Sequence, residues 1–180
     1  MNLQSNDFEL FDLPQQFSQN RSDIDSRWKQ LQREAHPDKF SAQGAAAQRI
    51  AMQWSVRINE AYQRLKNPLK RAAYLCELAG FPIQAHSNTA MPSAFLMQQI
   101  QWREDLDEAK NPADIEAIIA EVAQNQQSVL QNLEQLLDAK NAEKDREHNY
   151  SAAVGQVRVL MFMEKLLHDL DTALDTRLDE

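Results

Sequence analysis

Residues that break helices are rare in this chain, and their scarcity constrains the fold more than any other feature of the sequence. Three glycines and six prolines occur among 180 residues. Because these residues interrupt helices most strongly, long helical segments can form between them. We also find no alternating run of β-branched residues bounded by turn residues, as a strand would show. The sequence therefore predicts an all-α fold.

Apolar residues recur at helical spacing through most of the chain. One stripe consists of Ile24, Trp28, Leu31 and Ala35, and a second of Ile50, Trp54, Ile58, Ala61, Tyr62 and Leu65. Such stripes are typical of helices that bury one face. The pattern predicts helices at 6–12, from the polar residues 20–23 to about 35, and at about 42–66, 69–78, 93–109, 112–139 and 145–178.

A stretch with several chain breakers divides these helices into two groups. Gly80, Pro82 and Pro92 lie close together in the sequence, and such clusters mark loops. We expect an N-terminal domain at 1–75, a connector at 76–92 and a C-terminal domain at 93–180. Short charged turns between the last three helices favour an antiparallel three-helix bundle in the C-terminal domain.

The two halves carry charge of opposite sign. Residues 1–75 hold eleven basic and eight acidic side chains, whereas residues 76–180 hold eight basic and nineteen acidic side chains. This asymmetry suggests two different partners. The overall net charge of −8 argues against nucleic acid, because binding phosphates requires an excess of cations.

Several other classes of protein are not supported. Cys76 is the single cysteine and no C-x-x-C pair occurs, so we expect no disulfide within the chain, no metal site and no cofactor. The N-terminus lacks a signal-peptide pattern, and no apolar run approaches the roughly 20 residues of a membrane span. We therefore expect a cytoplasmic protein without a membrane partner.

The tripeptide His36-Pro37-Asp38 follows a basic helix and is the most informative short motif. No nucleophile, metal-ligand spacing or glycine-rich loop accompanies it, so a catalytic site is not indicated. Pro37 disfavours helical backbone at His36 and would hold the turn in a defined shape. The alternative is an ordinary turn at the end of a helix, with Asp38 capping the next segment.

Other segments extend this motif. The string INEAY occupies 58–62, and Leu65, Pro68, Arg71, Ala72 and Tyr74 follow at characteristic spacing. Together with the basic helix, these residues resemble a J-domain, the module that activates DnaK-type chaperones. The helical, acidic remainder, including AFLMQQIQWREDLDE at 94–108, makes nearly the whole chain similar to the HscB family of J-type co-chaperones of iron–sulfur cluster biogenesis. The eukaryotic members carry an additional N-terminal cysteine module, so the bacterial form fits better.

This resemblance implies a partner for the N-terminal domain. A J-domain docks on the ATPase side of a DnaK-type chaperone, called HscA in this family, and speeds its ATP hydrolysis without being an enzyme itself. The residues expected to bind the chaperone are His36, Pro37, Asp38, Lys39, Arg27, Lys29 and Arg33. The alternative for the basic side chains is a solvated helix face. If they dock on an acidic patch, they contribute orientation and association rate more than affinity.

The resemblance also implies a partner for the C-terminal domain, the iron–sulfur scaffold protein IscU, which the co-chaperone would deliver as client. Helical spacing places Phe95, Trp102, Leu106 and Ala109 towards the bundle. The residues that match the family's scaffold-binding surface are Leu96, Met97, Ile100, Arg103, Glu104 and Phe162. Gln101 departs from the acidic residue that the family has there. The alternative is that the connector or the J-domain covers this second apolar face.

Two further functions remain open on the sequence alone. The chain could be a J-domain co-chaperone for a different client, or a helical adaptor with no chaperone partner. A binding assay with the scaffold tests the first alternative, and an assay of chaperone ATPase activity tests the second.

Overall fold

The computed structural model describes residues 4–84, 91–138 and 143–178, and every regular element within these ranges is a helix. The α-helices are α1 (Asp7–Phe11), α2 (Arg21–Glu34), α3 (Ala45–Lys66), α4 (Pro68–Leu78), α5 (Ser93–Glu108), α6 (Pro112–Leu137) and α7 (Glu143–Leu178), and η1 (Pro37–Gln43) is a 3-10 helix. The chain forms two compact units, Met1–Leu75 and Cys76–Glu180. The all-α fold predicted from the sequence is confirmed.

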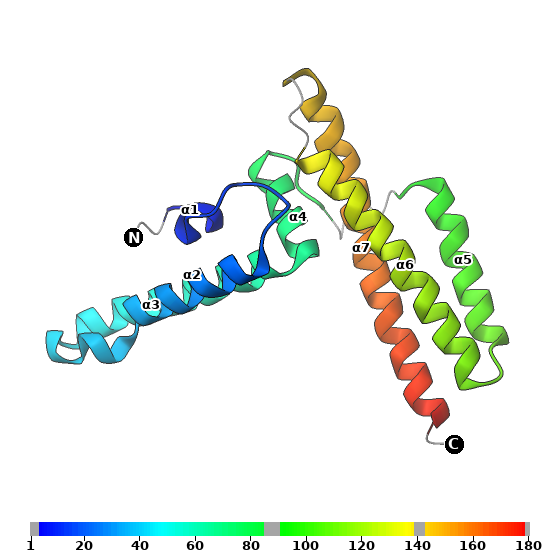
Figure 1. Cartoon of the computed structure of the whole chain (residues 1–180), viewed down its shortest axis with the longest axis horizontal. Coiled ribbons are helices and arrows are strands. Elements are labelled where there is room, and N and C mark those ends of the chain that lie inside the picture. The colour runs from blue at the N-terminus through cyan, green and yellow to red at the C-terminus, as the bar shows by residue number, and fades with distance from the viewer. Residues whose placement is uncertain (1–3, 85–90, 139–142, 179–180) are drawn as a thin grey trace. The chain divides into compact units, whose positions relative to one another are not determined.

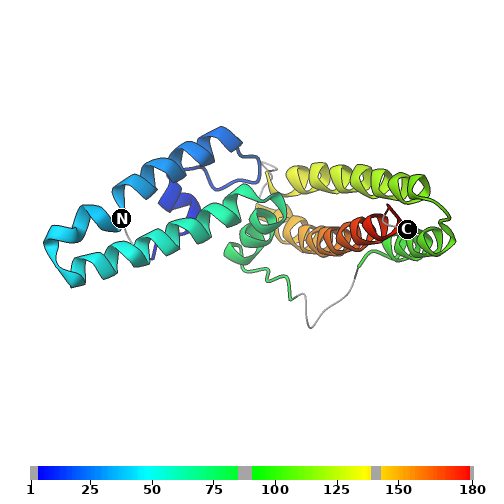
Figure 2. The ribbon, with the colours of Figure 1, turned by 90° about the horizontal axis from the view of Figure 1, so that it is seen from below.

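The first unit is organised around a hairpin of α2 and α3, which run antiparallel with η1 at the tip (Figures 1 and 2). Helix α1 packs against both α2 and α3. Their contact buries apolar side chains from all three helices. The most fully buried are Phe8, Phe11, Ile24, Ile58 and Leu65. This is the helical hairpin with a loop at His-Pro-Asp that a J-domain requires.

Asparagine side chains cap the N-termini of α1 and α2. The Asn6 side chain accepts a hydrogen bond from the Glu9 amide at 2.9 Å, and the Glu9 carboxylate accepts one from the Asn6 amide at 3.0 Å. Asn20 caps α2 by accepting from the Ser22 amide at 2.9 Å. Each bond satisfies an N-terminal amide that has no partner within its helix.

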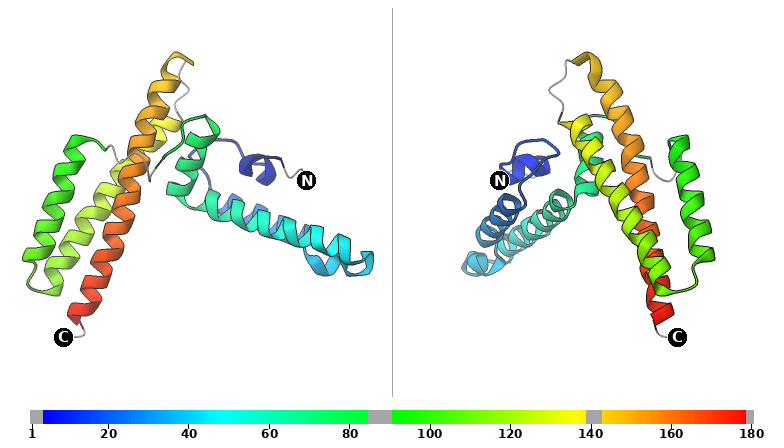
Figure 3. Two further views of the ribbon diagram at one scale, coloured as in Figure 1. Left: turned by 180° about the vertical axis from the view of Figure 1, so that it is seen from behind. Right: turned by 45° about the vertical axis from the view of Figure 1, so that its right-hand side comes forward.

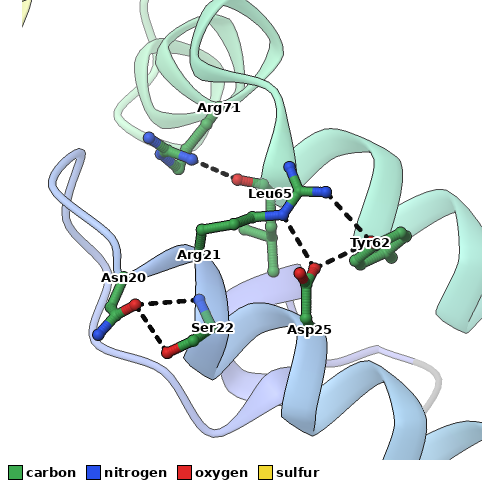
Figure 4. A network of polar contacts seen from close by, with 7 residues as sticks. All are labelled: Asn20, Arg21, Ser22, Asp25, Tyr62, Leu65 and Arg71. Carbon is green, nitrogen blue, oxygen red and sulfur yellow. Dashed lines mark hydrogen bonds and ion pairs between the residues drawn. The ribbon is translucent and has the colours of Figure 1, made fainter.

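A polar network ties α2 to α3 at the end of the hairpin remote from the tip (Figure 4). Asp25 Oδ1 accepts hydrogen bonds from the Tyr62 hydroxyl and from Arg21 Nε, both at 2.9 Å. The rings of Tyr62 and Trp28 stack with their centroids 4.8 Å apart. Arg71 of α4 donates a hydrogen bond to the Leu65 carbonyl in the last turn of α3. The contacts of Asp25 and Trp28 with Tyr62 fix how α2 lies against α3.

The second unit is an antiparallel bundle of α5, α6 and α7 (Figures 1 and 3). Asn111 and Asp114 form a capping box at the start of α6, with Pro112 as its first residue. Trp102 of α5 is fully buried, and its indole Nε1 donates to the Glu121 carboxylate on α6 at 2.9 Å. The buried residues of α6 and α7 include Ile115, Val122, Leu133, Val157, Leu160, Met163 and Leu170. The predicted three-helix bundle is confirmed.

The structure corrects the sequence prediction at the start of the third helix. Helix α3 begins at Ala45 rather than at about Ala42, because the tip continues as η1 and Gly44 then adopts φ = 88°. This left-handed conformation favours glycine and separates the two helices. Ile50, predicted to lie on the buried stripe, is 55% exposed. Its side chain lies at the tip, where the hairpin has no further layer to cover it.

The predicted connector at 76–92 overlaps the last turn of α4, and its residues 85–90 lie outside the described part of the chain. The predicted domain boundaries therefore stay a prediction. Within the described residues, no helix is long and apolar enough to span a membrane.

Candidate functional sites

The hairpin tip is built by His36 and Pro37. His36 is the N-cap of η1, and its Nδ1 accepts a hydrogen bond from the Asp38 amide at 3.3 Å. Its carbonyl accepts a second bond from the Lys39 amide at 3.0 Å. The side chains remain accessible, with 53% of His36 and 90% of Asp38 exposed. The predicted turn is therefore an ordered one that presents an imidazole and a carboxylate to solvent, although His36, and not Asp38, supplies the cap.

The basic residues predicted beside the tip differ in how far the fold engages them. Lys29 and Arg33 are exposed on α2, and Arg33 Nε donates to the Lys29 carbonyl at 3.2 Å. Lys39 is exposed on η1. Arg27 is held more firmly, because its Nε donates to the Phe11 carbonyl at 2.7 Å and its guanidinium lies 3.6 Å from the Asp12 carboxylate. Arg27 therefore joins α2 to the end of α1 in addition to any contact with a partner.

An apolar groove that the sequence pattern did not predict lies beside the tip. Its volume is about 420 Å³. It is lined by Glu34, Ala35, Phe40, Gln43, Ala47, Ile50, Ala51 and Trp54. The sequence pattern placed Ile50 in the core, so no exposed apolar surface was expected here. The one feature that could have indicated this groove is the position of Ile50 near the tip of the hairpin, where few other residues can cover it.

A contact between α2 and α3 precedes the tip. The Ser55 hydroxyl of α3 donates a hydrogen bond to the Ala35 carbonyl at 3.3 Å. Ala35 is the residue directly before His36 and is 4% exposed. Sequence reasoning could not find this contact, because no local pattern pairs residues on two different helices.

Helix α5 has two apolar faces, as its sequence predicts. Trp102 and Ala109 are buried against the bundle, and Phe95 and Leu106 are half-buried. The opposite face carries the residues predicted to bind the scaffold. Of these, Leu96 is 39%, Met97 75% and Ile100 54% exposed, and Arg103 and Glu104 are also exposed. The three apolar side chains thus form an exposed patch on α5.

Phe162 of α7 extends this face across to a second helix. Its ring is half-buried and meets Phe95 edge-on, with the centroids 5.5 Å apart. The Arg103 guanidinium lies 5.8 Å from the centre of the Phe162 ring, within the range of a cation–π contact. The structure thus brings Phe162 and Arg103 together, and it gives Phe162 a packing role beside its predicted binding role. Gln101 donates to Asp105 at 2.9 Å on the same helix.

Neither a cluster of metal ligands nor an ionised thiol occurs among the described residues. Among the described residues, no group of three His, Cys, Asp or Glu side chains could hold a metal ion. Burial raises the pKa of the Cys76 thiol to about 12, so this cysteine is held as the neutral thiol near neutral pH. The tip offers directed hydrogen bonds and the α5 face offers exposed apolar area.

Comparisons with known proteins agree with this arrangement. A family described as the HSCB C-terminal oligomerisation domain matches residues 91–171. The co-chaperone protein HscB homolog of Bordetella petrii is 44% identical over 167 residues, which cover 92% of this chain and 94% of that relative. The corresponding homolog of Paraburkholderia phytofirmans is 42% identical and covers 98% of both chains.

Two solved structures share the fold. The chaperone HscB from Vibrio cholerae matches with a TM-score of 0.78 and 33% identity, covering 96% of this chain and 99% of that one. The human co-chaperone protein HscB matches with a TM-score of 0.83, covering 96% of this chain and 83% of that one. Its sequence identity of 22% makes this second match evidence for the fold alone.

Proposed function

The chain belongs to the HscB family of co-chaperones, and we propose that it binds an IscU-type iron–sulfur scaffold and delivers it to an HscA-type, DnaK-like chaperone. In this role the protein stimulates ATP hydrolysis by the chaperone in the cytoplasm and catalyses no reaction itself. The observation that carries the proposal is that the tip at 36–39 and the apolar face of Leu96, Met97 and Ile100 are both exposed and belong to separate compact units.

The tip is suited to act on a chaperone. Its ordered backbone holds His36 and Asp38 at defined positions, so their docking would exchange water for directed hydrogen bonds. Lys29, Arg33 and Lys39 add positive charge on the same end of the hairpin, which would orient an acidic partner and speed association. We assign Arg27 and Pro37 to the same surface, with Arg27 also supporting the fold. The corresponding domain is residues 1–75.

The α5 face is suited to hold the scaffold. Leu96, Met97 and Ile100 expose apolar area, and Arg103 and Glu104 supply charged neighbours. Interfaces of this kind combine a central apolar cluster with a polar rim. Phe162 completes the surface from α7. The scaffold-binding domain is then residues 93–180, with 76–92 as connector.

Because both surfaces belong to one chain, scaffold binding is coupled to the engagement of the chaperone. A scaffold bound to the second unit is tethered near the chaperone that the first unit engages. Tethering raises the effective concentration of the client at the chaperone without requiring tight binding at either surface. The rate of ATP hydrolysis rises because the co-chaperone favours the hydrolysis-competent state of the chaperone. Each ~1.4 kcal/mol by which it stabilises that state corresponds to about a tenfold higher rate.

The proposal is tested by measuring ATP hydrolysis by a purified HscA-type chaperone with this protein, with and without the scaffold. We expect stimulation by the protein alone and a larger rise when the scaffold is present. His36→Gln should abolish the stimulation. His168→Gln makes the same substitution on an exposed face of α7 and should leave it intact. A wild-type protein that produced no rise, or equal activity of His36→Gln and wild type, would contradict the proposed role of the tip.

The description of the matched family as an oligomerisation domain favours a second use for the same unit, contact between copies of this chain. Sedimentation of the protein alone and with the scaffold separates the two uses. If the α5 face binds the scaffold, Met97→Ser weakens the mixed complex; if it joins copies of the chain, the same change dissociates the protein alone.

A further inference from the structure

The backbone at the end of α2 reaches the tip with one carbonyl that the tip cannot satisfy. The carbonyl groups in the last turn of a helix lack partners within that helix. Just past Ala35, Pro37 has no amide hydrogen to donate. The Asp38 amide is used by His36 Nδ1, and the Lys39 amide by the His36 carbonyl. The Ala35 carbonyl therefore depends on a donor from elsewhere in the fold.

Ser55 is that donor. Its hydroxyl reaches from α3 to the Ala35 carbonyl, at 3.3 Å, and both residues are shielded from solvent at least in part. A buried carbonyl without a partner is costly, so this bond restrains the last residue before His36. The tip is then fixed at its entry by Ser55 and within its first turn by the cap of His36.

We propose that Ser55 is a positioning residue for the chaperone-binding tip, acting through the Ala35 carbonyl to hold His36 and Asp38 in the conformation that docks. This inference rests on the proposed function of the tip. Ser55 lies on α3, where it is partly buried, and it needs no contact with the chaperone for this role. Ser55 increases the fraction of molecules whose tip is in the binding conformation. The apparent affinity for the chaperone is proportional to that fraction.

The experiment compares Ser55→Ala with Ser55→Thr, which keeps a hydroxyl. In the protein alone, hydrogen exchange of the Asp38 and Lys39 amides should become about fivefold faster in Ser55→Ala, the change expected from losing one hydrogen bond. With the chaperone, the concentration for half-maximal ATPase stimulation should rise by up to about fivefold while the maximal stimulation is retained. Ser55→Thr should restore both quantities towards wild type.

Ser128→Ala is the matched control, because the Ser128 hydroxyl also donates to a carbonyl at 3.3 Å, that of Gln124, but within α6 of the other unit. It should change neither quantity. Unchanged exchange at the tip in Ser55→Ala, or faster exchange with an unchanged half-maximal concentration, would overturn the inference while leaving the proposed function intact. A lower maximum without a shift in concentration would overturn it too. Absence of stimulation by the wild type would overturn the proposed function and this inference with it.

Discussion

At the scale of single residues, the Tyr62 side chain both packs in the hairpin and stabilises the charge of a neighbouring carboxylate. Its ring stacks on Trp28, and its hydroxyl donates to Asp25 Oδ1 at 2.9 Å. This hydrogen bond is the main cause that lowers the pKa of Asp25 below its ordinary value of 3.8, and the neighbouring Arg21 adds to it. The same bond raises the pKa of Tyr62 above 10.0. The pair therefore favours the ionised carboxylate in the folded protein.

Replacing Tyr62 by phenylalanine should raise the pKa of Asp25 towards 3.8, because the ring is kept and only the donor is lost. A carboxyl group with a lowered pKa stabilises the fold above its unfolded pKa and loses this effect as the pH falls through the folded value. The difference in unfolding free energy between neutral and strongly acidic solution should accordingly shrink.

A carbon NMR titration of the Asp25 carboxyl group measures this pKa directly. Tyr150→Phe is the control, because the pKa of Tyr150 is raised chiefly by burial in the other unit and the residue is not a partner of Asp25. An Asp25 pKa that stayed the same in Tyr62→Phe would show that Arg21, and not the hydroxyl, lowers it.

At the scale of elements, α1 is held on the hairpin by a buried carboxylate. Asp7 is completely buried, with Arg57 at 2.6 Å and Arg64 at 3.0 Å, both on α3. The Asp7 amide also donates to the Tyr74 hydroxyl of α4 at 3.0 Å. An element of five residues is too short to be a stable helix alone, so these contacts and its buried rings hold it in place.

Asp7→Asn should lower the unfolding free energy by about 2 kcal/mol, since it removes the charge that two arginines face. The figure is below that for a fully buried pair, because the side chains of Arg57 and Arg64 are 21% and 37% exposed. Urea denaturation followed by tryptophan fluorescence measures the loss. Asp12→Asn is the control, whose 86% exposed carboxylate should contribute less than about 0.5 kcal/mol. Equal effects of the two changes would contradict the role given to Asp7.

At the scale of the whole molecule, the proposed recognition surfaces belong to two compact units with opposite net charge. Each surface is presented by rigid helices, the tip by α2 and α3 and the apolar face by α5 and α7. Such a division allows one surface to be altered while the other still works. The function of the chain would then depend on both surfaces being occupied together.

The double substitution of Met97 and Ile100 by serine should therefore remove the additional ATPase stimulation that the scaffold provides. Stimulation by the protein alone should persist, because the tip is unchanged. Both side chains are more than half exposed, so helicity measured by circular dichroism should also persist.

Leu178→Ser is the matched control for this double variant, because it removes an exposed apolar side chain, 63% accessible, from the end of α7. It should leave the scaffold effect intact. A loss of folding in the double variant would instead mean that the α5 face belongs to the core.

Phe162→Ser should lower both stability and scaffold binding, since its ring packs on Phe95.

The helices, the starts of α2 and α6 and the motif at the tip follow from the sequence. Asn111-Pro112 predicts the start of α6, and the spacing of Trp102 and Ala109 predicts which face of α5 is buried. These features could be predicted because caps and helical periodicity depend on residues within one or two turns of each other. The resemblance of the tip to a J-domain was likewise carried by an ordered set of local motifs.

Only the tertiary structure decided which side chains on different helices meet. It brings Ser55 to Ala35, places Phe162 against Phe95 and leaves Ile50 exposed at the end of the hairpin. These outcomes depend on the rotation and offset of one helix against another, which packing across the whole hairpin or bundle sets and no local pattern encodes. The sequence by itself thus determined the elements and the motif, and the packing of those elements decided how the motif is held and which apolar residues remain for a partner.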